Sequence, residues 1–90
     1  MAAKGLSSSQ IRAARALLRW SADDLARASA LGLNTIKRAE LAKDTTSLTV
    51  ANDLAVRRAL EAAGVEFIDE NGGGPGVRLR EAPQHGKRRD

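Results

Sequence analysis

The chain has 90 residues, of which 42% are hydrophobic and only two, Trp20 and Phe67, are aromatic. Alanine supplies 17 of the hydrophobic residues, so the composition favours helices around a thin core with little volume for an internal ligand cavity. With no cysteine and a single histidine, His85, the chain lacks a disulfide framework, a thiolate metal site and most imidazole catalysis. We therefore expect no enzyme activity, no cofactor and no metal.

The net charge of +4 is unevenly distributed along the chain. Residues 1–40 carry +4, residues 41–76 carry −3 and residues 77–90 carry +3. The positive charge of residues 1–40 favours a polyanionic partner, although the same charges can simply solvate the surfaces of helices. No apolar run approaches the roughly 18 residues of a membrane span, and the first residues lack the apolar run of a secretory signal. We expect a cytoplasmic protein without a membrane partner.

A first helix is predicted over residues 8–19, capped by Ser8 or Ser9, after a flexible N-terminus at residues 1–7. Its apolar residues recur at the spacing of a buried stripe: Ile11, Ala14 and Leu18. A second row on a different face is basic: Arg12, Arg15 and Arg19. This row can follow a phosphate backbone or face water.

Two shorter helices are predicted next. Ser21 caps the first of them, which ends near Ser29. Gly32 lies in the tight connection that follows, where glycine can adopt a backbone conformation costly for other residues. The third helix covers residues 34–41, with Asn34 as its candidate cap.

The second half of the chain changes from helical to alternating patterns. A fourth helix is predicted over residues 49–63, with Val50 and Leu54 extending its apolar side and Gly64 as its stop. Short strands are predicted at 65–68 and 77–80, joined by the glycine-rich residues 69–76. The predicted domain thus covers residues 8–80, with its hairpin at 65–80, and residues 81–90 form a disordered basic tail.

The runs SADDLARAS at 21–29 and NTIKRAE at 34–40 resemble the helix-turn-helix of the XRE family, the phage lambda repressor and Cro type. Residues 10–18, 57–67 and 72–79 extend the resemblance. It implies a mainly α fold: a four-helix lambda-repressor-like helix-turn-helix domain with a short C-terminal β-hairpin and a disordered basic tail. It also implies a transcriptional regulator, a repressor or controller, that reads the major groove of double-stranded DNA with its third helix.

The resemblance places the DNA-binding residues around the start of the third helix: Gly32, Leu33, Asn34, Thr35, Lys37 and Arg38. Asn34 can pair with adenine, and Lys37 and Arg38 can neutralise phosphates. Arg15 and Arg19 are candidate phosphate contacts. In the structural alternative, Lys37 is solvated and Arg38 pairs with acidic neighbours.

Three positions depart from the family pattern. Ala22 stands where members usually place a glutamine that contacts phosphate, Gly32 replaces a serine, and Leu33 replaces a polar base reader. These residues make the surface less polar, as the core of a protein interface is. The alternative function is therefore a protein-interaction module, anti-activator or antitoxin-like, that binds a protein partner instead of DNA.

The predicted hairpin leaves unpaired strand edges, which can pair with a second copy of the chain. We therefore expect a homodimer through the C-terminal hairpin. A twofold dimer of this kind sets two recognition helices about 34 Å apart, one turn of B-DNA, and implies a palindromic operator.

Overall fold

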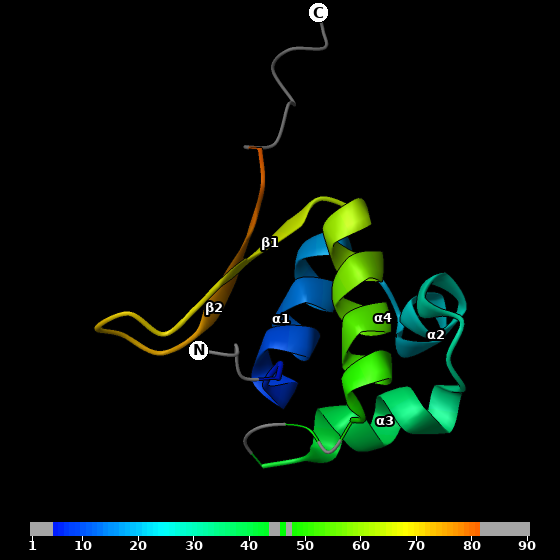
Figure 1. Ribbon diagram of the computed structural model, residues 1–90. Helices are drawn as coiled ribbons and strands as arrows, with labels where there is room; N and C mark the ends of the chain where they lie inside the picture. The colour runs from blue at the N-terminus through cyan, green and yellow to red at the C-terminus, as the bar shows by residue number, and fades with distance from the viewer. Residues whose placement is uncertain (1–4, 44–45, 47, 82–90) are drawn as a thin grey trace, which may run out of the picture.

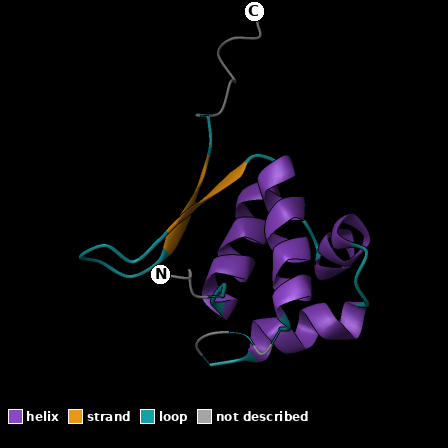
Figure 2. Cartoon of the chain, in the orientation of Figure 1, coloured by secondary structure: helices purple, strands orange, loops and turns teal. Residues whose placement is uncertain are grey.

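The computed structural model describes residues 5–43, 46 and 48–81. Within this range the elements are α1 (Ser8–Leu18), α2 (Ala22–Ser29), α3 (Leu33–Leu41), α4 (Val50–Ala62), β1 (Val65–Ile68) and β2 (Gly76–Leu79). Figures 1 and 2 show the helices gathered into one body, with α3 across its lower end and the hairpin extending to one side next to α1. The prediction of a mainly helical chain with a short antiparallel hairpin is confirmed.

One hydrophobic core joins the helices to the hairpin. Its largest fully buried apolar side chains are Leu6, Ile11, Leu25, Ile36, Val56, Leu60 and Val65. α1, α2 and α3 contribute the periodic apolar faces by which the sequence located them, and α4 contributes Val56 and Leu60. Val50 and Leu54, which were predicted to extend the apolar side of α4, are instead 80% and 40% exposed. None of the described helices has both the length and the apolar character that a membrane crossing requires.

The start of α1 differs from the prediction. Ser7 is the cap: its hydroxyl accepts a hydrogen bond from the Gln10 N–H, and the Gln10 side chain accepts one from the Ser7 N–H, each at 3.0 Å. Ser8 is instead buried and donates to the carbonyl of Ala42 at 2.6 Å. The prediction of a flexible N-terminus is wrong at Leu6, which is fully buried, and at Ser7. Residues 1–4 lie outside the described residues.

The turn between α2 and α3 uses a different residue than expected. Ala30, the C-cap of α2, has the left-handed backbone conformation, with φ +62°. Gly32 has φ −69° and ψ 148°, which any residue adopts, and serves as the N-cap of α3 without a side-chain hydrogen bond. The prediction that Gly32 supplies the unusual conformation is therefore wrong.

We expect Ala30→Gly to raise the free energy of unfolding by about 0.5–1 kcal/mol, because a left-handed conformation is strained for alanine and free for glycine. Ala28→Gly, at an exposed position inside α2, is the matched control and is expected to lower it by about 1 kcal/mol. Urea unfolding measures both. Equal losses for the two variants would show that Ala30 is not left-handed in solution.

The hairpin follows α4 directly, with Gly64 in a positive-φ conformation at the junction (φ +111°). Val65 pairs with Leu79 and Phe67 with Val77, so the predicted apolar residues share one side; β2 begins at Gly76, one residue before its predicted start. Gln10 fixes the loop end of the two strands to α1, because its side-chain amide donates to the carbonyls of Ile68 and Gly76. Of the predicted tail, only Glu81 lies within the described residues.

Candidate nucleic-acid interface

The residues 30–32 join two short helices that pack against each other and against different neighbours. α2 contacts α3 and α4, while α3 also contacts α1. Ile36, which is fully buried, and Ala39 hold the inner side of α3 in the core. The outer side of α3 is thereby fixed toward the lower end of the molecule (Figure 1).

The outer side of α3 carries three exposed polar residues that the sequence singled out: Asn34, Lys37 and Arg38. Asn34 and Lys37 are three residues apart and so lie on the same side of the helix. Neither Lys37 nor Arg38 forms an ion pair with an acidic residue that the structure describes. Both cations can therefore meet an external anion without breaking an internal pair.

The other predicted contact residues of this segment are placed differently. Leu33 is half-buried and packs against the core, and Thr35 is half-buried. Gly32 is exposed, and the space beside its Cα is open: a Cβ added there would meet only Thr35 Oγ1, at 3.9 Å. The structure thus brings Gly32, Asn34, Lys37 and Arg38 to the surface and turns Leu33 largely inward.

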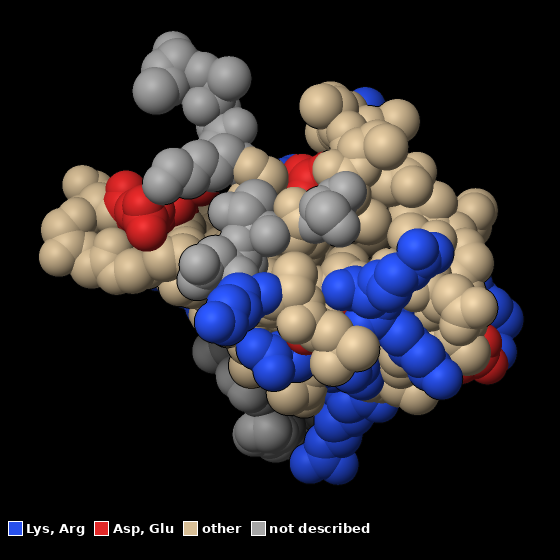
Figure 3. Space-filling view, turned by 90° about the horizontal axis from the view of Figure 1, so that it is seen from below, with Lys and Arg blue, Asp and Glu red and all other residues tan. Residues whose placement is uncertain are grey.

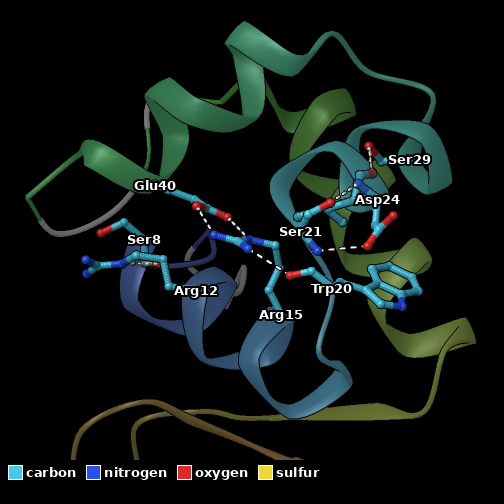
Figure 4. A network of polar contacts seen from close by, with 9 residues as sticks. Ser8, Arg12, Arg15, Trp20, Ser21, Asp24, Ser29 and Glu40 are labelled. Atoms are coloured by element: carbon cyan, nitrogen blue, oxygen red, sulfur yellow. Dashed lines mark hydrogen bonds and ion pairs between the residues drawn. The ribbon is translucent and has the colours of Figure 1, made fainter.

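Arg15 forms an internal ion pair with Glu40 (Figure 4). Its Nε and Nη2 donate to the two carboxylate oxygens of Glu40 at 2.6 and 2.7 Å, and its Nη1 donates to the carbonyl of Trp20 at 2.8 Å. The hydrogen bond to Glu40 raises the pKa of Arg15 above its ordinary value. Because these donors are engaged within the protein, Arg15 links α1 to α3 and is not among the phosphate contacts proposed below.

Arg19 is exposed and ends α1 as a left-handed C-cap, with φ +58°. It forms no ion pair with any described acidic residue, so it stays a candidate phosphate contact. Trp20 is half-buried and packs against the core, so its ring is not among the candidate contacts with a base.

Lys and Arg side chains gather on the face of the molecule that carries α3. Figure 3 shows this face, with most of the visible acidic side chains toward its margins. Arg12, which the sequence placed in the arginine row, is exposed and bonds to the carbonyl of Ser8; Ser8 in turn bonds to Ala42, just after α3. Arg12 and the exposed Lys43 therefore add to the cations of α3 on this side.

No protein-family model matches the chain, and neither does any curated protein sequence. The support for a nucleic-acid interface consequently comes from the exposed side chains of α3 and the basic face around them.

Proposed function

We propose that this protein is a sequence-specific DNA-binding transcriptional regulator, a repressor or controller with a lambda-repressor-like helix-turn-helix, that inserts α3 into the major groove. The observation that carries the proposal is the outer side of α3, where Asn34, Lys37 and Arg38 are exposed and the cations have no ion-pair partner among the described residues. An exposed helix on a basic face fits the major groove in width and in charge.

Each exposed residue has a distinct expected role. Asn34 lies in the first turn of α3, and its amide can donate to N7 and accept from N6 of adenine in a bidentate pair. Lys37 lies one turn later and reaches a guanine edge or a phosphate, while Arg38 and Arg19 neutralise phosphates. Gly32 offers its backbone N–H at the N-terminus of α3, where an anion is favoured by the helix dipole.

The experiment that tests this function is selection of bound duplexes from a random pool at two salt concentrations. Enrichment of one sequence, with affinity that falls steeply as salt rises, supports a specific regulator. Weak binding without enrichment would reduce the proposal to nonspecific attraction by a basic surface. Absence of binding at low salt, combined with capture of a stoichiometric protein partner, would favour the protein-interaction module instead.

The protein-interaction module was suggested by the apolar residues at the three departures from the family pattern, and these positions expose less apolar surface than expected. Of the three departures from the family pattern, Ala22 and Leu33 are half-buried and pack against the core. They therefore serve the packing of α2 and α3 and add little apolar surface for a partner. Only Gly32 is fully part of the exposed face.

We expect Lys37→Ala to weaken DNA binding for all sequences and to lower the magnitude of the salt slope by about 0.9, because one phosphate contact is lost. Asn34→Ala is expected to leave the slope unchanged and to relax the preference at one base pair by about 1–3 kcal/mol. Titration of labelled duplexes over a salt series measures both. Arg78→Ala, which removes the same charge from the exposed hairpin, is the control. If Lys37→Ala and Arg78→Ala weaken DNA binding equally, α3 is not the DNA-binding surface.

A further inference from the structure

α3 receives less capping from its own sequence than the other helices that the structure describes. The N-cap residues of α1, α2 and α4 each accept a backbone N–H through a side-chain hydroxyl: Ser7, Ser21 and Thr49. Gly32, the N-cap of α3, has no side chain that can do so. At the other end, Ala42 has an extended backbone (φ −63°, ψ 150°), whereas the last residues of the other three helices are followed by caps that donate their N–H to carbonyls of the last turn. The order of α3 therefore depends on contacts with other elements.

α1 supplies two polar contacts to the C-terminal end of α3. The Ser8 hydroxyl donates to the carbonyl of Ala42 at 2.6 Å, and the Arg15 guanidinium meets the carboxylate of Glu40. Ser8 and Arg15 are about two helical turns apart in α1, so both lie on the side of α1 that faces α3 (Figure 4). One helix thus holds the end of α3 at two points.

The burial of Ser8 makes its contact with Ala42 a specific link between the two helices. Serine is mostly exposed in folded proteins, but the Ser8 side chain is fully buried and its hydroxyl bonds to another element. Solvent therefore does not compete for this hydroxyl. The side chain is also short, so it holds the carbonyl of Ala42 close to the backbone of α1, whereas the long side chain of Arg15 tolerates more movement.

The place of Ala42 determines where the exposed residues of α3 point. Ala42 ends the helix and is followed directly by the exposed Lys43. α3 has nine residues and is about 13 Å long, so a displacement of its C-terminal end tilts the whole helix. Such a tilt moves Asn34 and Lys37 relative to the base edges that they are proposed to contact.

We propose that Ser8 is a positioning residue for DNA binding, which fixes the direction of α3 through the carbonyl of Ala42. This inference rests on the proposed function. Ser8 is buried and touches no DNA, so it acts only through α3. Its loss leaves every cation of the basic face in the protein but frees the end of α3. Base contacts, which need a fixed geometry, are then weakened, whereas attraction to phosphates is not.

Ser8→Ala tests this role, with Ser29→Ala as the matched control. Ser29 is also buried, but its hydroxyl donates to the carbonyls of Leu25 and Ala26 within α2 and so joins no two elements. We expect Ser8→Ala to lower the ratio of specific to nonspecific DNA affinity by about tenfold, the loss of roughly one base contact, and to leave the salt slope unchanged. Ser29→Ala should change neither quantity.

Titrations of a selected duplex and of an unrelated duplex over a salt series measure both quantities, after thermal unfolding has established that the variants are folded. If Ser8→Ala does not fold, Ser8→Cys, which keeps the size of the side chain and weakens its donor, has the same expected result. An unchanged ratio would overturn the proposal, and so would an equal fall for Ser29→Ala, because the effect would then be a general loosening. A lower salt slope would mean that a phosphate contact is lost, which also contradicts the positioning role.

Hydrogen exchange of the chain without DNA separates this inference from the proposed function. Ser8→Ala is expected to exchange the amides of residues 38–41 about fivefold faster, as for the loss of one hydrogen bond, while the amides of α2 keep their rates. If the parent chain bound no DNA, the proposed function would fail, while faster exchange in α3 would still show that Ser8 orders this helix. Unchanged exchange in α3, or equal acceleration in α2 and α3, would overturn the role of Ser8.

Discussion

Replacing Glu40 with alanine is expected to lower the free energy of unfolding by about 2–3 kcal/mol, because it leaves the Arg15 guanidinium inside the fold without its counter-charge. The two side chains are only 23% and 10% exposed and meet through two hydrogen bonds. Breaking a fully buried pair costs about 3–5 kcal/mol, and the partial exposure of Arg15 reduces this figure.

Glu40→Ala should also disturb the position of α3, the proposed DNA-binding helix, because the Arg15–Glu40 pair joins α1 to the last turn of α3. Arg15 also holds the carbonyl of Trp20, just before α2. Loss of Glu40 therefore loosens three helices relative to one another. We expect DNA affinity to fall although Glu40 itself makes no proposed contact with DNA.

Urea unfolding of Glu40→Ala, Arg15→Met and the Arg15→Met/Glu40→Leu double variant checks this interpretation. The double variant is expected to regain most of the lost stability, because neither charge is then left unpaired. Arg78→Ala, which breaks the exposed pair with Glu66, should cost less than about 1 kcal/mol. Losses for Glu40→Ala as small as for Arg78→Ala would show that the pair does not hold α3 in place.

Local signals were sufficient to locate the helices and strands. Ser21 and Gly64 mark the start of α2 and the end of α4 through short-range chemistry, a side-chain cap and a positive-φ glycine. The alternating pattern likewise locates β1 and β2 to within one residue, whereas the pairing of Phe67 with Val77 comes from the structure. Exposure of Asn34 and Lys37 follows from the helical period once Ile36 is placed inside.

Features that depend on distant residues could not be predicted in this way. The Arg15–Glu40 pair joins positions 25 residues apart, and nothing near either residue indicates the other. The half-burial of Leu33 depends on how closely α2 and α3 pack, and the left-handed turn falls on Ala30 although the only nearby glycine is Gly32. In each case tertiary packing overrides a reasonable local preference.

Leu6 is the clearest of these features, because it lies where the sequence predicted a flexible segment and is nevertheless fully buried. Its backbone is held at both polar groups: the N–H donates to Asp53 Oδ1 of α4 at 2.9 Å, and the carbonyl accepts from the Thr46 N–H at 3.2 Å. Residues before α1 are thus tied to the loop before α4 and to α4 itself. A single leucine ahead of a capped helix gives no periodic signal, so only the assembled core reveals it.

Leu6→Ala is expected to lower the free energy of unfolding by about 2–4 kcal/mol, through lost burial and the cavity left behind. For a domain of this size, whose total stability is about 4–10 kcal/mol, this is a large fraction. Leu41→Ala removes the same atoms from a side chain that is 83% exposed and should change stability by less than about 0.5 kcal/mol. Deletion of residues 1–7 should unfold the domain, because it removes Leu6 together with the Ser7 cap. Thermal unfolding of the three variants measures these effects. Equal stability of Leu6→Ala and Leu41→Ala would show that Leu6 is not packed in the core.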